Sequence, residues 1–230
     1  MKLKAVVFDL FGTLVDDFSI REHECLLSKM AKVLSAPRDA FAQMWVETFP
    51  QRATGLFPTI EANIKHVCQV LGCHVTDAQI KKASAMRLNF VRQKLTPRPG
   101  VLDILAQLRS KTYKIGLITN CSPELPKLWP TQKLANLVDV AVFSCLEGVK
   151  KPDPKIYMVA CQRLEVAPRN CLYIGNGSSH ELTGAAAVGM RPLLLRVPYE
   201  TYDTYRIEVD EWQGSSISDL KEILTILKIN

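Results

Sequence analysis

Five short, continuous apolar runs constrain the fold of this chain more than any other feature. They span residues 4–10, 114–119, 139–144, 171–175 and 192–197. Apolar runs of this length are typical of strands buried on both faces of a sheet, and segments with helical spacing separate them here. The sequence therefore predicts an α/β protein, with a Rossmann-like parallel sheet core that is flanked by helices.

Helical patterns connect these strands and close the chain. They cover residues 100–111, 154–165, 181–189 and 216–228. The last segment combines a Ser/Asp start with apolar residues three and four apart, which predicts a helix that begins at residue 216.

Residues 17–94 differ from the rest of the chain. They contain four helical patterns, at 21–34, 38–48, 60–72 and 77–94, and no strand pattern. We therefore expect an all-helical domain, 17–94, inserted into an α/β domain made of 1–16 and 95–230. The segment LTPRPG at 95–100 is expected to act as a hinge between the two.

Charge and hydropathy exclude several functional classes. The net charge is +6, with Lys and Arg scattered along the chain, so a nucleic-acid partner is not expected. No apolar stretch approaches the ~20 residues that cross a bilayer, and no signal peptide is recognisable. We expect a cytoplasmic protein without a membrane partner. A mild positive field suits a small anionic metabolite, and the oligomeric state stays open.

The seven cysteines do not form a metal or redox motif. None is spaced as CxxC, and most are predicted to be small core residues. Cys121 is the exception, because it follows a candidate site segment and could line a pocket.

Polar side chains stand where the apolar runs end, and ligands of open α/β sheets bind beyond the carboxyl ends of the strands. Asp9 ends the first run and could be a nucleophile, a metal ligand or a helix cap. The turn Gly12-Thr13 follows it. Thr119 and Asn120 end the second run and could hold an anion or cap a helix.

Two later segments add candidate groups. Lys151 stands before a proline and could pair with a carboxylate, or it could be a solvated surface lysine. The loop GNGSSHELTG at 175–184 could bind an anion through its backbone, present Glu181 to a metal, or only connect a strand to a helix.

Together these segments resemble the haloacid dehalogenase superfamily of aspartyl-nucleophile hydrolases. The resemblance rests on FDLFGTL, LITN, KPDPKIY, and YIGNG with the following glutamate and GAAAVGM, in that order along the chain. The helical insertion resembles the cap domain of that family, which closes over the site.

The resemblance implies specific roles. Asp9 would attack the substrate and form a covalent intermediate, and Thr119 and Lys151 would complete the catalytic group. The residues that would contact substrate are Phe11, Gly12, Thr13, Asn120 and Tyr157. A magnesium ion would lie at the positions of Asp9, Phe11, Asn176 and Glu181.

Two departures from the family pattern affect the chemistry. Phosphatases of the family carry a second Asp where this chain has Phe11, and phenylalanine cannot transfer a proton. Their fourth motif carries acids where this chain has Asn176 and Glu181, so we expect a weakened Mg²⁺ site. An aromatic residue at position 11 and the segment around Tyr157 resemble the metal-independent 2-haloacid dehalogenases.

The sequence leaves three functions open: hydrolysis of a phosphate ester or acyl phosphate, dehalogenation of a 2-haloacid, or binding without catalysis. Dehalogenases of the family use an early cap arginine, and neither Arg21 nor Arg38 stands in a recognisable motif. A phosphonatase would use a cap lysine, for which Lys29 and Lys32 are positional candidates only. His180 is a further candidate acid–base group.

Overall fold

The computed structural model describes residues 2–198 and 209–229. Within them a six-stranded parallel sheet has the order β3-β2-β1-β4-β5-β6. Its strands are β1 (Ala5–Phe8), β2 (Lys114–Thr119), β3 (Val140–Phe143), β4 (Cys171–Gly175), β5 (Arg191–Leu195) and β6 (Ser216–Ile217). The five predicted strands and the α/β class are confirmed.

The sixth strand corrects the predicted helix at 216–228. Ser216 and Ile217 pair with Leu194 and Leu195 of β5, and the helix α11 spans only Glu222–Ile226. The Glu222 side chain accepts hydrogen bonds from the backbone N–H groups of residues 218 and 219 at 2.8 and 2.9 Å. Pairing with the sheet edge therefore overrides the local helical pattern, and the helix starts after the strand ends.

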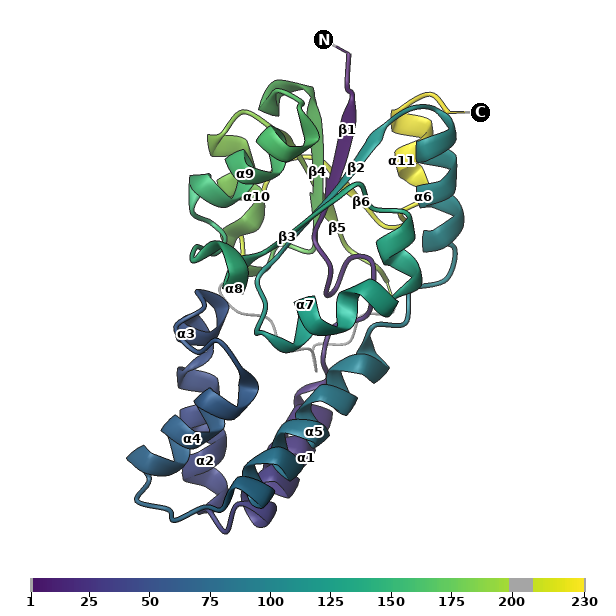
Figure 1. Cartoon of the computed structure of the whole chain (residues 1–230). Helices are drawn as coiled ribbons and strands as arrows, with labels where there is room; N and C mark the ends of the chain where they lie inside the picture. The colour runs from purple at the N-terminus through teal and green to yellow at the C-terminus, as the bar shows by residue number, and fades with distance from the viewer. Residues whose placement is uncertain (1, 199–208, 230) are drawn as a thin grey trace.

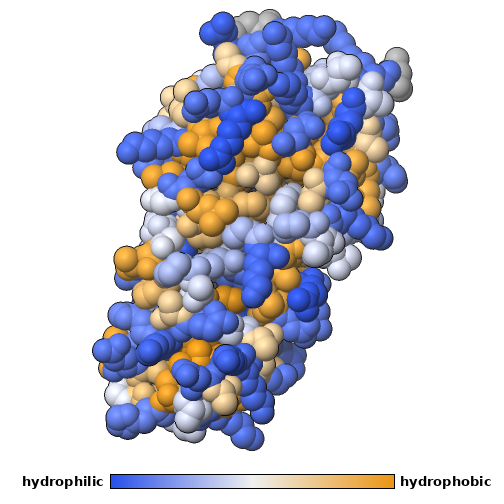
Figure 2. Space-filling view, in the orientation of Figure 1, coloured by the Kyte–Doolittle hydropathy of each residue, from blue (hydrophilic) through white to orange (hydrophobic). Residues whose placement is uncertain are grey.

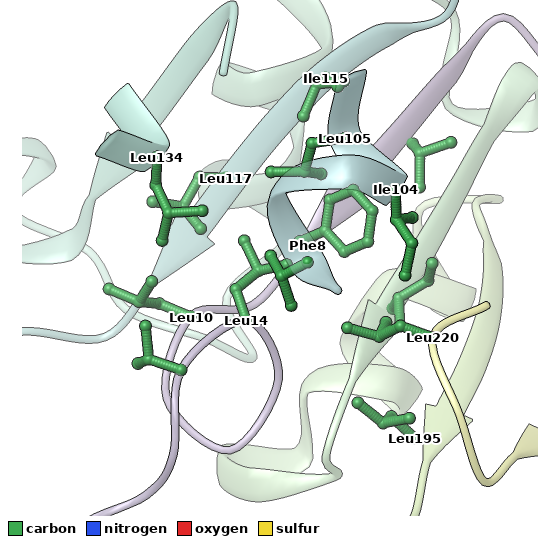
Figure 3. Close-up of a cluster of buried hydrophobic side chains, with 14 of the residues drawn as sticks. Phe8, Leu10, Leu14, Ile104, Leu105, Ile115, Leu117, Leu134, Leu195 and Leu220 are labelled. Atoms are coloured by element: carbon green, nitrogen blue, oxygen red, sulfur yellow. The ribbon is translucent and has the colours of Figure 1, made fainter. Parts of the chain in front are cut away.

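Helices cover both faces of the sheet (Figure 1). Helices α6 (Val101–Ser110) and α11 pack on one face, and α9 (Pro154–Leu164) and α10 (Glu181–Ala187) pack on the other. Alternate residues of β1 divide between the two faces, since Val6 and Phe8 join one hydrophobic cluster and Ala5 and Val7 the other. Figure 3 shows Phe8 in the first of these clusters.

Short helices fill the connections at the edges of the sheet. They are α7 (Glu124–Leu128), α8 (Ser144–Glu147) and the 3₁₀ turns Trp129–Thr131, Lys133–Asn136, Pro168–Asn170 and Ser178–His180.

Residues 20–94 fold into helices around a hydrophobic cluster of their own. The helices are α1 (Ile20–Val33), α2 (Arg38–Glu47), α3 (Phe49–Ala53), α4 (Ile60–Val70) and α5 (Asp77–Lys94). Figure 1 places this helical unit at the end of the sheet where β1 leads into α1. The four predicted helices are confirmed, and α3 was missed because a five-residue helix with a proline in its first turn has almost no periodicity to detect.

The two segments that connect the helical unit to the sheet lie side by side. Val15 and Pro97 form an antiparallel bridge, and the backbone N–H of Arg98 donates to the Leu14 carbonyl at 2.9 Å. The Arg98 Nε also lies 2.9 Å from a carboxylate oxygen of Asp16. Both crossings of the chain between the units therefore occur at one place.

No helix among the described residues has both the length and the apolar character that a bilayer span requires. Figure 2 shows hydrophilic residues over much of the visible surface, with hydrophobic residues scattered among them.

The buried cluster beneath α6 should carry much of the stability of the α/β unit. Leu105 is fully buried there, so Leu105→Ala should lower the free energy of unfolding by about 2–5 kcal/mol through a cavity. Leu56→Ala, at a leucine that is 66% exposed in the helical unit, is the matched control and should change it by less than about 0.5 kcal/mol. Urea unfolding measures both, and equal effects would contradict the assigned core.

Candidate active site

The carboxyl ends of the strands and the helical unit enclose one pocket. Asp9 lies one residue beyond β1, where its backbone N–H donates to the Ile174 carbonyl of the neighbouring β4 at 2.9 Å. Thr119 is the last residue of β2 and lines the same pocket. The parallel register thus brings residues that are more than a hundred positions apart to one edge of the sheet.

Asp9 is held from two sides. Its carboxylate accepts a hydrogen bond from the Thr13 hydroxyl at 3.3 Å and another from the Lys151 ammonium at 2.5 Å. Asp9 is nearly buried yet lines the pocket. A carboxylate has about four lone-pair sites, so these two contacts fix its orientation and leave acceptor capacity toward the pocket.

Lys151 also binds Glu181, which is fully buried. The Glu181 carboxylate accepts from the Lys151 ammonium at 2.5 Å, from the Tyr173 hydroxyl at 2.8 Å and from the Gly177 N–H at 3.0 Å. One ammonium thus lies between two carboxylates, those of Asp9 and Glu181.

The electrostatics of this group follow from its burial. Burial, and then the charge of Asp9, raise the pKa of Glu181 to about 7 against the opposing effect of Lys151. Burial alone would lower the pKa of Lys151, but the carboxylates of Asp9 and Glu181 outweigh it and raise that pKa. Lys151 is therefore a cation at neutral pH.

Asn120 and Tyr157, both predicted to contact substrate, support this ion group. The Asn120 side chain accepts from the Lys151 N–H at 2.8 Å and donates to the Lys151 carbonyl at 3.2 Å. Asn120 also lines the pocket. Tyr157 is fully buried outside the pocket lining, and its hydroxyl donates to the Glu181 carbonyl at 2.9 Å.

The turn after β1 packs tightly against the fourth motif. Gly12 has a φ of +77°, and a Cβ at this position would lie 1.9 Å from the Asn176 amide nitrogen, so only glycine fits. That amide donates to the Asp17 carboxylate at 3.3 Å, and the Asn176 carbonyl accepts from the Ser178 N–H at 3.1 Å. Asp17, which lines the pocket, adds a carboxylate that the sequence analysis did not select.

The chemistry of the donor set does not fit the predicted Mg²⁺ site in this arrangement. The Glu181 carboxylate accepts three hydrogen bonds, the ammonium of Lys151 lies between it and Asp9, and Phe11 has no side-chain donor for a cation. In the described part of the chain, no three His, Cys, Asp or Glu side chains come together as a metal-binding group.

The other candidates lie in different surroundings. His180 is exposed, with its Nδ1 3.4 Å from an Asp210 carboxylate oxygen, and it is not part of the pocket lining. Cys121 lines the pocket and is buried, with its Sγ 3.8 Å from that of Cys145. All seven cysteines are free, and five of them are buried.

The basic residues considered in the early helical unit do not reach the pocket. Arg21, Arg38, Lys29 and Lys32 are all exposed and absent from its lining.

Two buried arginines reach it instead. Arg52 of α3 donates through Nε to the Ser122 hydroxyl at 3.2 Å, and Arg87 of α5 donates through Nε to the Glu124 carboxylate at 2.8 Å. Both contacts join the helical unit to the α/β unit, and all four residues line the pocket. Arg87 could have been found from helical spacing, because it falls on the buried face of α5 four residues before Val91.

Comparisons with known proteins identify the family of this chain. The sequence model described as haloacid dehalogenase-like hydrolase matches residues 3–189. A glyceraldehyde 3-phosphate phosphatase of Pyrococcus furiosus is 29% identical over 133 residues, which are 56% of this chain and 54% of that protein. The chain thus spans about half the length of this phosphatase.

Dehalogenases match over a longer part of the chain. (S)-2-haloacid dehalogenase 1 of a Pseudomonas species is 23% identical over 229 residues, with 96% of each chain covered. A solved 2-haloacid dehalogenase from Pseudomonas syringae pv. Tomato has a TM-score of 0.74 at 22% identity, with 98% of each chain covered, and shows that the two share a fold. Because the family match covers most of its length, the chain belongs to the haloacid dehalogenase-like hydrolases.

Proposed function

We propose that this protein is a metal-independent hydrolase that displaces halide from a small 2-haloacid, with Asp9 as the nucleophile. The observation that carries the proposal is the position of the Lys151 ammonium between the carboxylates of Asp9 and Glu181. A fixed cation at this point supplies the positive charge that a divalent ion would otherwise provide.

The residue at position 11 supports this choice of leaving group. Phe11 lines the pocket where a phosphatase of the family would carry a general acid, and it packs against Phe18 with ring centroids 4.8 Å apart. An alkoxide needs a proton as it leaves, whereas halide leaves as a stable anion. A reaction that expels halide is therefore compatible with an aromatic residue here.

The proposed reaction has two steps. An Asp9 carboxylate oxygen attacks C2 of the haloacid, so that a carbon–oxygen bond forms and the carbon–halogen bond breaks, with its electron pair leaving on the halide. Water then adds to the ester carbonyl of Asp9, the hydroxy acid leaves, Asp9 is regenerated, and one proton is released to solvent.

The surrounding residues position the nucleophile. The hydroxyl of Thr13 and the ammonium of Lys151 orient the two oxygens of Asp9. Asn120 fixes the backbone of Lys151, and Glu181 fixes its side chain. Thr119 also lines the pocket, and in this proposal its hydroxyl binds the carboxylate of the substrate.

Hydrolysis of a phosphate ester or acyl phosphate is the second candidate. The Asp17 carboxylate, in the pocket and hydrogen-bonded by Asn176, favours it, because Asp17 could provide the acid that Phe11 cannot. The phosphatases among the relatives are compatible with this function.

The test is a screen of purified protein against 2-haloacids, phosphate monoesters and acyl phosphates, each with EDTA and with Mg²⁺. We expect halide release that EDTA leaves unchanged, and Asp9→Asn should reduce it by at least about 10³-fold because the nucleophile is lost. Asp103→Asn, at an exposed aspartate on α6, is the control and should retain full activity.

Other outcomes have defined meanings. Phosphate release that requires Mg²⁺ and Asp9 would replace the proposal with the second candidate. No turnover of any substrate would indicate a protein that binds ligands without catalysis.

Removing the Lys151 ammonium should destabilise the fold. Lys151→Ala leaves two buried carboxylates without a cation and should cost about 3–5 kcal/mol of unfolding free energy at pH 8. Lys155→Ala, at an exposed lysine of α9, should cost little.

The loss should depend on pH with a defined sign. The pKa of Glu181 is about 7 in the folded protein, above its ordinary value of 4.5, so ionised Glu181 lowers stability and its protonation restores stability as the pH falls. Without Lys151 this effect is larger. The difference in unfolding free energy between the parent protein and Lys151→Ala should therefore be smaller at pH 5 than at pH 8. Urea unfolding at several pH values measures this difference. A constant difference would contradict the assigned ion group.

A further inference from the structure

Two buried arginines of the helical unit line one end of the pocket, and both lie against the same tryptophan ring. The guanidinium carbons of Arg52 and Arg87 lie 4.3 and 5.9 Å from the centroid of the same Trp45 ring. Each residue is at least 95% buried. Placing two cations against one indole in a dry environment has a free-energy cost, so the arrangement calls for a compensating interaction.

Arg87 has hydrogen-bond donors that no acceptor in the described part of the chain uses. Of its three guanidinium nitrogens, only Nε has a hydrogen-bond partner among the described residues, the Glu124 carboxylate. Its Nη1 is buried without a partner. A guanidinium normally uses its planar fork to bind an oxyanion through two donors. Because Arg87 lines the pocket, the pocket is the space from which such an acceptor can arrive.

The local charge also favours an anion. Two guanidinium groups face one carboxylate, that of Glu124, at this end of the pocket. His23 also lines this end of the pocket. Burial, and then the charges of Arg87 and Arg52, lower its pKa to about 3, so His23 is neutral and does not change this balance. The other acidic side chains in the lining, Asp9 and Asp17, contact Lys151 and Asn176 at the sheet end.

We propose that the Arg87–Arg52 end of the pocket binds a second carboxylate of the substrate, remote from the carbon that Asp9 attacks, so that the protein prefers 2-halogenated dicarboxylic acids. The first carboxylate is attached to the reacting carbon and must stay beside Asp9 and Lys151, at the sheet end. The inference rests on the proposed function for its reaction, but its binding groups, Arg87 and Arg52, are not those that hold Asp9.

The two arginines are not equivalent in this site. Arg52 is anchored through Nη1 to the Trp45 carbonyl, the Thr48 hydroxyl and the Asn63 amide oxygen at 2.7–2.9 Å, so it contributes a fixed positive charge. Arg87 contributes the hydrogen-bond donors. Specificity for a carboxylate should therefore depend chiefly on Arg87.

The first test compares kcat/KM for 2-chlorosuccinate and 2-chloropropionate. We expect the dicarboxylate to be preferred by about tenfold to a hundredfold, the range expected for a charge-assisted hydrogen-bond pair. Replacing Arg87 alone would leave Glu124 buried without its cation, so the informative variant is Arg87→Met/Glu124→Gln, which removes both charges.

In that variant the ratio for the two acids should fall to within about twofold. Arg92→Met, at an exposed arginine on the same helix, should keep the full preference. Equal kcat/KM values for the two acids in the parent protein would overturn the inference. So would an equal loss on both acids in the double variant, which would instead assign the arginines to the halide or the first carboxylate.

A second measurement does not depend on turnover. Isothermal titration should show succinate binding at least tenfold more tightly than propionate to the parent protein, and the difference should vanish in Arg87→Met/Glu124→Gln. Circular dichroism and the melting temperature establish that the variant is folded. Selective succinate binding without halide release would overturn the proposed function and retain this site, whereas halide release without dicarboxylate preference would do the reverse.

Discussion

The ammonium of Lys151 is the interaction on which the rest of the site depends. It lies between two buried carboxylates, that of Asp9 just beyond β1 and that of Glu181 at the start of α10, and its own backbone is fixed by the amide of Asn120 just beyond β2. Without it, two negative charges would come together in a dry environment. The same cation also orients Asp9, the proposed nucleophile, so that stability and the proposed chemistry depend on one group.

Asp9 and Glu181, the acids of the first and fourth motifs, lie in different surroundings. Asp9 faces the pocket and can react, whereas Glu181 is fully enclosed behind Lys151, with hydrogen bonds from Tyr173 and Gly177. In this arrangement the carboxylate of the fourth motif holds the ammonium of the lysine instead of a metal ion. This is the difference on which the proposal of a metal-independent reaction depends.

The sequence predicted what depends on local pattern. The strands β1 to β5, four helices of the helical unit and the polar residues that follow the strands were all indicated by apolar runs and short motifs. Strand β6 has two residues and forms only by pairing with β5, and α3 has five, so neither produces a period of its own. Helical spacing indicates that Arg87 is buried, but that Arg52 and Arg87 line the pocket follows from the packing of one unit on the other, which no single stretch of sequence encodes.

Two polar contacts between the units lie at the pocket itself. The Arg52–Ser122 and Arg87–Glu124 hydrogen bonds join the units, while the connecting segments cross at a single point beside Val15 and Pro97. Apolar packing also crosses this boundary, because Val91 of α5 belongs to the hydrophobic cluster of the sheet and Leu88 and Phe90 pack against the clusters of both units. Separating the units would therefore expose apolar side chains as well as these polar partners. An anion that binds Arg87 in the pocket would add to the contacts that hold the two units together.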